Sequence, residues 1–114
     1  MGIKNIQVYL PVKLNLNLED DIENSLYKNK NDGIIAILRR TQLKGKLTKK
    51  YPKDAMLHYE DSNTQVVSLY LPSVLFKDLM LLVEERSIYP SFRALVIAFL
   101  HNNYAGGLSI DQFK

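Results

Sequence analysis

Cysteine is absent from this sequence of 114 residues, and only His58 and His101 are histidine. Without cysteine the chain has no disulfide framework, no thiolate zinc site and no cysteine nucleophile. Two histidines that lie far apart in the sequence exclude a histidine-rich metal site and show no metal-ligand spacing. We therefore expect a protein that holds no metal and no cofactor.

Long apolar runs are also absent. The two longest, Leu79–Val83 and Ala94–Leu100, are far shorter than the ~20 residues that a membrane-spanning helix needs. The segment from Met1 to Pro11 contains no apolar run of the signal-peptide type. These absences predict a cytoplasmic protein without a membrane partner.

A catalytic constellation is missing as well, because no nucleophile and base can be combined. One cluster of carboxylates has no histidine or basic neighbour to tune it, and we interpret it as favourable charge at a helix start. Its members are Glu19, Asp20, Asp21 and Glu23. We interpret Gly106-Gly107 as a helix stop and His101 as a helix-end residue that interacts with the helix dipole. The sequence therefore predicts a protein that is not an enzyme.

The chain does have the composition of a folded domain, with 46% hydrophobic and 24% charged residues. Its length fits one compact domain. The net charge is only +3, but residues 41–64 hold five lysines against three acidic residues. These lysines are Lys44, Lys46, Lys49, Lys50 and Lys53. The run is either a solvated linker or a segment that lies along nucleic-acid phosphate.

An internal repeat is the most informative pattern. The segment Ile6-Gln-Val-Tyr-Leu-Pro11 recurs as Val67-Ser-Leu-Tyr-Leu-Pro72, at an offset of 61 residues (72 − 11 = 61). Alternating side chains in each copy predict a short strand that has one buried face and ends at its proline. The alternation assigns six residues to the outward face, namely Asn5, Gln7, Tyr9, Val66, Ser68 and Tyr70.

A helical pattern follows each strand. In the first copy Asn17 is the expected N-cap, with Asp20 at the third helical position. The apolar stripe of this helix consists of Leu18, Ile22 and Leu26. In the second copy Ser73 is the expected cap of a helix whose last turn lies near Glu84.

A second helix is predicted in each copy after a short polar break. Asn31 or Asp32 is expected to cap the first of these helices, with Gly45 as its stop. Pro90-Ser91 is expected to start the other. Aligning Asn31 with Ser91 gives an offset of 60 (91 − 31 = 60), one residue less than for the strands.

One strand and two helices bury too little apolar surface to fold alone. We therefore expect the two copies to pair their strands into an antiparallel ribbon and to interlock their four helices. The expected organisation is a first unit at 3–43, a basic linker at 44–63, a second unit at 64–104 and a C-terminal tail at 105–114. We leave open an extra strand over Met56–Tyr59, and a tail that is either disordered or docked on a neighbouring molecule.

Each copy has a strand that ends in Leu-Pro, a leucine three positions later (Leu14 or Leu75), and a capped, apolar second helix. These features resemble the ribbon-helix-helix DNA-binding regulators, the family of the Arc and MetJ repressors. The resemblance covers residues 3–43 and 64–103, and the tandem arrangement is similar to small regulators of archaeal viruses. It implies a mainly α fold, a tandem ribbon-helix-helix repeat that forms an intramolecular pseudo-dimer, and host cytoplasm as the location of a viral chain.

The resemblance also implies that the ribbon enters the major groove of double-stranded DNA and that its six outward residues contact bases. Asn5 and Gln7 would then make the bidentate contact to adenine that amides favour. Tyr9, Ser68 and Tyr70 would hydrogen-bond to bases or phosphates, and Val66 would meet a thymine methyl group. Because the two halves differ, we expect an imperfect or asymmetric operator.

In this family the second contact with DNA is a phosphate that backbone N–H groups hold at the start of the second helix. The resemblance, together with the lysines, assigns phosphate contacts to Asn31, Gly33, Ser91, Phe92, Lys13, Lys44, Lys46, Lys49 and Lys50. Asp32 departs from the pattern because it is negative where a phosphate would sit. Neither strand carries the arginine or lysine that many relatives project into the groove, which predicts a modest salt dependence.

Three functions are compatible with these patterns. The first is a sequence-specific transcriptional regulator, repressor-like, with autoregulation and self-association on DNA as open options and no small-molecule effector inferred. The second is an antitoxin-type module that binds a protein partner through its linker or tail. The third is a protein that coats DNA without sequence preference. A solvated sheet face with no ligand is the alternative to all three.

Overall fold

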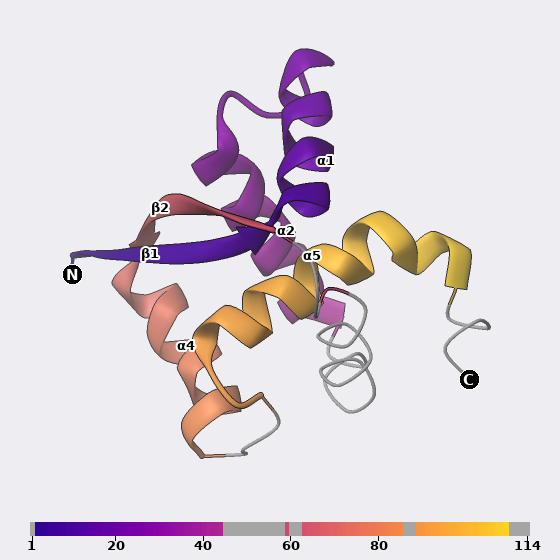
Figure 1. The fold of residues 1–114 in the computed structure, drawn as a ribbon. Helices are drawn as coiled ribbons and strands as arrows, with labels where there is room; N and C mark the ends of the chain where they lie inside the picture. The colour runs from indigo at the N-terminus through magenta and orange to yellow at the C-terminus, as the bar shows by residue number, and fades with distance from the viewer. Residues whose placement is uncertain (1, 45–58, 60–62, 86–88, 110–114) are drawn as a thin grey trace.

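The computed structural model describes residues 2–44, 59, 63–85 and 89–109. A strand and two helices follow one another twice along the chain. The elements are β1 (Ile3–Pro11), α1 (Val12–Glu23), α2 (Lys30–Lys44), β2 (Thr64–Pro72), α4 (Ser73–Glu84) and α5 (Phe92–Ser109). In Figure 1 the two strands lie between α1 above and α4 below, and α2 meets α5 near the centre of the molecule. Within the described residues, no helix has the length and apolarity that crossing a membrane requires.

The two strands pair antiparallel, from Ile3 opposite Pro72 to Pro11 opposite Thr64. Both end at proline as predicted, since proline has no amide to donate to the ladder. Gln7 lies opposite Ser68, and these two residues are themselves one repeat offset apart (68 − 7 = 61). Exchanging the two halves therefore maps this central pair onto itself.

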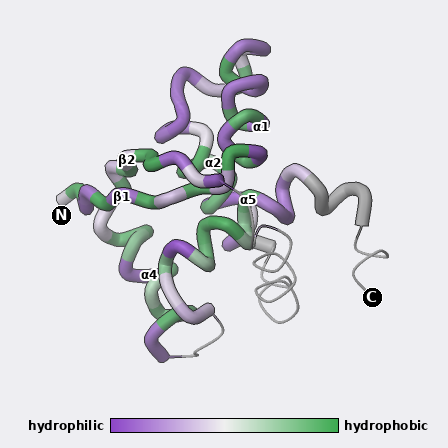
Figure 2. Tube along the Cα trace, in the orientation of Figure 1, coloured by the Kyte–Doolittle hydropathy of each residue, from purple (hydrophilic) through white to green (hydrophobic). Residues whose placement is uncertain are grey.

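The inner face of the two strands is buried under the helices. Val8, Leu10, Val67, Leu69 and Leu71 are each at most 7% exposed. The most buried element is the first half of α5, where every residue from Ala94 to Leu100 is at most 1% exposed. Figure 2 shows this half of α5 in predominantly hydrophobic colour and alternating colours along both strands. The core is therefore built between the inner face of the strands and α5.

Each second helix contacts the strand of the other half. At the start of α5, Arg93 Nε donates a hydrogen bond of 2.7 Å to the carbonyl oxygen of Tyr9 in β1. At the start of α2, Asn31 Oδ1 accepts a hydrogen bond of 2.8 Å from the amide of Tyr70 in β2. Tyr9 and Tyr70 are one repeat offset apart (70 − 9 = 61), so the two contacts are made at equivalent strand positions.

The prediction for the start of each first helix is wrong. Helix α1 begins at Val12 rather than after Asn17, and α4 includes Ser73 rather than using it as a cap. In both cases a proline precedes the helix and no side chain caps it. The Val12 amide instead donates across the ribbon to the Asn63 carbonyl at 2.9 Å. Because the partner strand supplies this acceptor, one of the orphan amides of a helix start needs no capping side chain.

The end of α1 also differs from the prediction. The helix ends at Glu23, and Ser25 has a φ of 65°, a left-handed conformation that interrupts the helical path. Leu26, expected as the last member of the apolar stripe, is therefore 65% exposed.

The predicted role of the carboxylate cluster is wrong, because its residues lie in the second half of α1 and not at its start. Two of them bind neighbouring elements instead. Glu19 forms an ion pair with Lys30 at 3.1 Å, at the start of α2. Asp21 accepts a hydrogen bond of 2.8 Å from the Tyr104 hydroxyl of α5. The cluster therefore connects α1 to both second helices.

The caps of the second helices revise the alignment of the repeat. Asn29 caps α2, because its Oδ1 accepts a hydrogen bond of 2.8 Å from the Asp32 amide, so neither Asn31 nor Asp32 is the cap. Ser91 starts α5 as predicted and accepts a hydrogen bond of 3.1 Å from the Ala94 amide. The two caps are 62 residues apart (91 − 29 = 62), so the slippage between the copies has the opposite sign to the predicted one.

Helix α5 continues through Gly106 and Gly107 to Ser109, so the predicted stop is wrong. Each glycine costs a helix about 1 kcal/mol relative to alanine but leaves the hydrogen-bond ladder intact. His101 consequently lies inside the helix and not at its end. It is 3% exposed, and its Nδ1 lies 2.8 Å from the hydroxyl of buried Tyr59. Tyr59 is in a turn, while the rest of the segment considered for an extra strand, residues 56–58, is outside the described residues.

Candidate nucleic-acid interface

The six residues assigned to the outward face are all exposed, as the alternation predicts. They form three cross-strand pairs: Asn5 with Tyr70, Gln7 with Ser68, and Tyr9 with Val66. We call this surface the outward face. The two tyrosines and Val66 are each 51–55% exposed. Large half-exposed side chains gathered on one sheet face are typical of a binding surface.

The chemistry of the outward face is polar and uncharged. It offers two carboxamides, a serine hydroxyl and two phenol hydroxyls, with Val66 as the one aliphatic member. A carboxamide both donates and accepts, as the major-groove edge of adenine requires. The equivalent positions of Tyr9 and Tyr70 place one phenol at each end of the face.

The strand backbone under both tyrosines is fixed from the side by the second helices. Arg93 holds the carbonyl of Tyr9, and Asn31 holds the amide of Tyr70. Arg93 also brings a positive charge to the edge of the ribbon, where the strands themselves carry none on their outward face. Arg93 was not among the predicted contacts, although a basic residue two positions after the expected helix start at Ser91 was a usable signal.

The start of α5 is a suitable anion site. Ser91 satisfies the Ala94 amide, and the amides of Phe92 and Arg93 have no acceptor within the helix. The positive end of the helix dipole points the same way. The predicted phosphate contacts at Ser91 and Phe92 therefore lie where backbone donors are available, next to the Tyr9 end of the outward face.

The start of α2 is less suitable, because the negative Asp32 lies in its first turn, whereas the first turn of α5 has no acidic residue. The Gly33 amide donates to the Asn29 carbonyl at 3.0 Å, and Asn31 Oδ1 is occupied by the Tyr70 amide. Gly33 has a packing role, since a Cβ there would lie 2.9 Å from the Tyr27 ring. The Gly33 amide that was expected to bind phosphate is therefore used within the helix, whereas the Asn31 amide, like that of Arg93, has no acceptor within its helix.

The predicted lysine contacts are only partly described. Lys13 is exposed at the second position of α1. Lys44 is the last residue of α2, and Lys46, Lys49 and Lys50 lie outside the described residues. Lys4, on the inner parity of β1, has its Nζ 5.6 Å from the centre of the Phe76 ring. Of the predicted lysine contacts, Lys13 is the one whose side chain the structure describes.

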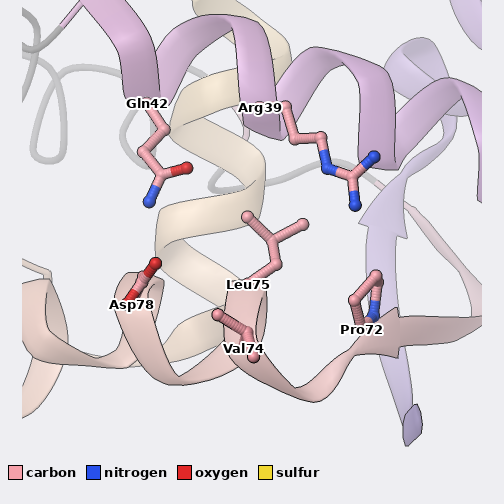
Figure 3. A pocket seen from close by; sticks show the side chains of 6 residues that line it. All are labelled: Arg39, Gln42, Pro72, Val74, Leu75 and Asp78. Atoms are coloured by element: carbon pink, nitrogen blue, oxygen red, sulfur yellow. The ribbon is translucent and has the colours of Figure 1, made fainter. Parts of the chain in front are cut away.

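An open pocket of about 330 Å³ lies between α2 and α4. In Figure 3, Arg39 and Gln42 of α2 face α4 across it. The residues that line it are Arg39, Gln42, Pro72, Val74, Leu75 and Asp78. No sequence pattern pointed to this pocket, because it arises from the spacing of two helices from different halves.

Three tyrosines away from the outward face are buried or partly buried, namely Tyr59, Tyr89 and the partly buried Tyr104. Burial raises the pKa of Tyr59 to about 12, and burial is also the largest cause of the raised pKa values of Tyr89 and Tyr104. The hydroxyls therefore stay protonated at neutral pH, as the bond from Tyr104 to Asp21 requires. Among the described residues, no group of three acidic or histidine side chains could hold a metal ion.

No family model, curated protein or solved structure matches this chain. A function is therefore inferred from its own residues and their arrangement. Arg93 and the start of α5 lie beside β1 at Tyr9, one of the six outward residues, whereas the pocket lies between α2 and α4.

Proposed function

We propose that this chain is a sequence-specific DNA-binding regulator of the ribbon-helix-helix type, with two halves that act as an intramolecular pseudo-dimer. The observation that carries the proposal is the outward face. It presents hydrogen-bonding side chains of both strands side by side, in a register centred on Gln7 and Ser68. A two-stranded ribbon fits the major groove, which is ~12 Å wide and displays a distinct donor and acceptor pattern for each base pair.

Supporting evidence comes from the groups that flank the outward face. The amides of Phe92 and Arg93, which have no acceptor within α5, and the Arg93 side chain adjoin its Tyr9 end, where DNA phosphates would pass. Lys13, two residues beyond the end of β1, adds a second cation at that end. The bases would be read by uncharged groups and the backbone held by few cations, so affinity should fall only modestly with salt.

Selection of bound sequences from a random DNA pool tests this proposal. The purified full chain should enrich one motif, and its preference over random competitor should persist as salt rises and nonspecific binding fades. Binding without an enriched motif would favour the DNA-coating alternative and overturn sequence-specific regulation.

Alanine variants of the outward face test the assignment of residues. Gln7→Ala and Tyr70→Ala should each reduce affinity for the selected motif by roughly tenfold, while their affinity for random DNA changes little. Leu81→Ala, which truncates an exposed side chain far along α4, is the matched control. Circular dichroism melting should show that all three variants remain folded. Unchanged motif affinity in both strand variants would contradict the proposal and leave an antitoxin-type module as the better account.

A further inference from the structure

The two ends of the outward face are chemically unequal although their backbones are equivalent. One end carries Asn5 beside Tyr70, and the other carries Val66 beside Tyr9. Exchanging the halves brings each tyrosine onto the other and brings Asn5 onto Val66 (66 − 5 = 61). Both ends therefore share a tyrosine and differ at one position, where one end has a carboxamide and the other an isopropyl group.

This difference predicts that the Asn5 end discriminates among bases more strongly than the Val66 end. A carboxamide can make two hydrogen bonds to the edge of one base, and such a pair gives strong discrimination against other bases. Valine has no donor or acceptor and meets only an apolar group such as a thymine methyl. Loss of a methyl contact leaves no polar group unpaired, so its cost is smaller than that of a broken bidentate pair.

The two ends also differ in charge, and the positive charge is at the end without the carboxamide. The Val66 end adjoins the Arg93 side chain and, just beyond the strand, Lys13. The equivalents of Arg93 and Lys13 at the Asn5 end are Asn31 and Val74. Of the two neighbours of Asn31, Lys30 is paired with Glu19 and Asp32 is negative.

Lys4 is also near the Asn5 end, but it belongs to the inner parity of β1 and lies over the Phe76 ring. Attraction for DNA phosphate is therefore concentrated at the end that discriminates less among bases.

We infer that the two ends of the outward face have different roles in binding DNA: the Asn5 end discriminates among bases, and the Val66 end binds the DNA backbone. This inference rests on the proposed function. The operator is then directional, with one stringent half-site and one tolerant half-site, and the essential phosphates lie on the tolerant side.

The test starts from the motif selected by the wild-type chain and changes each base pair in turn, measuring affinity for every duplex. Changes in the stringent half-site should reduce affinity by roughly ten- to 100-fold, and the equivalent changes in the other half-site by less than about threefold. Replacing single phosphates with neutral methylphosphonates should weaken binding mainly on the tolerant side.

Two matched variants assign the ends. Val66→Asn should make the tolerant half-site stringent, and Asn5→Val should make the stringent one tolerant. Both substitutions lie at exposed strand positions, and unchanged melting temperatures would confirm that the fold is kept. Two equally stringent half-sites, or an asymmetry that neither variant alters, would overturn the inference while leaving the regulator intact. Failure to select any motif would instead overturn the proposed function.

Discussion

The two halves of the molecule have nearly the same backbone but different side chains at equivalent positions. Strands and first helices correspond residue by residue at an offset of 61, and α1 and α4 are both 12 residues long. Leucine occupies both members of three equivalent core pairs, namely Leu10 and Leu71, Leu14 and Leu75, and Leu18 and Leu79. The shared backbone therefore depends on a few matched leucines, and other positions have been free to diverge.

The contact between the start of each first helix and the ribbon shows this divergence. In the first half, buried Asn15 donates a hydrogen bond to Gln65 of β2. The equivalent residues of the second half are Phe76 and Lys4, and there the lysine lies over the aromatic ring. Phe76 also packs against Phe92, with ring centres 5.0 Å apart. A polar pair and an aromatic cluster thus fill the same place in the fold.

The second helices diverge further. With the caps aligned, His101 of α5 corresponds to Arg39 of α2 (101 − 62 = 39). His101 is buried beneath Tyr59, whereas Arg39 is exposed and lines the open pocket. The comparison indicates that α5 is the central helix of the core, while α2 keeps one polar side in water.

The largest expected effect tests whether the matched leucines support one common core. Leu18 and Leu79 are both fully buried, so Leu18→Ala and Leu79→Ala should each lower the free energy of unfolding by about 2–5 kcal/mol. Urea denaturation followed by circular dichroism measures both. Leu81→Ala, at a position 45% exposed, should change stability by less than about 0.5 kcal/mol. A large loss in one half only would show that the halves do not unfold together.

The polar and aromatic contacts should respond in opposite directions. Phe76→Asn removes packing against Phe92 and should destabilise the protein by about 2 kcal/mol. Asn15→Leu should stabilise it by about 1 kcal/mol, because the buried Oδ1 of Asn15 has no hydrogen-bond partner among the described residues. Thermal melts of both variants measure whether each substitution lowers or raises the stability of the protein. Strong destabilisation by Asn15→Leu would mean that the carboxamide is required at this position.

Tyr59 covers His101 of α5 and should make the stability of the protein depend on pH. Its pKa is raised by burial from 10.0 to about 12, so its neutral form is favoured in the folded state. The corresponding stability is fully present below about pH 10 and is lost as the pH rises towards 12. Tyr59→Phe should lower stability at pH 7 by about 1 kcal/mol through loss of the bond to His101, and should flatten the decline above pH 10. An equally steep alkaline decline in this variant would assign the effect to other groups.

The smallest expected effect compares Lys13 with its equivalent, Val74. Lys13→Ala should weaken DNA binding a few-fold and reduce the slope of log affinity against log salt by about 0.9, the contribution of one phosphate contact. Val74→Ala should leave the slope unchanged. Titrations at several salt concentrations measure both variants, and equal slopes for wild type and Lys13→Ala would remove Lys13 from the interface.

The strands and the exposure of their outward residues could be predicted because alternation and proline are local signals. Both strands end at the predicted prolines, and all six outward residues are exposed. The helix starts could not be predicted, because the first amide of α1 is satisfied by Asn63, a residue 51 positions away (63 − 12 = 51). The predicted caps at Asn17 and Ser73 are therefore wrong, because neither helix start uses a capping side chain.

The rest of the candidate site depends on contacts that single elements do not encode. Arg93 reaches Tyr9 only because α5 crosses the strand of the other half. In the other half, the Asn31 side chain reaches the Tyr70 amide only because α2 crosses β2 in the same way. Sequence periodicity predicts which face of an element is buried, but not which element from the other half will cover it.

A titration of the ¹⁵N-labelled chain with the selected operator duplex, followed by amide chemical shifts, tests the central claim most directly. The account predicts that the largest shifts fall on residues 5–9 and 66–70 and on the amides of Phe92 and Arg93, with small shifts around the pocket between α2 and α4. Large shifts confined to the pocket, with both strands unperturbed, would contradict it.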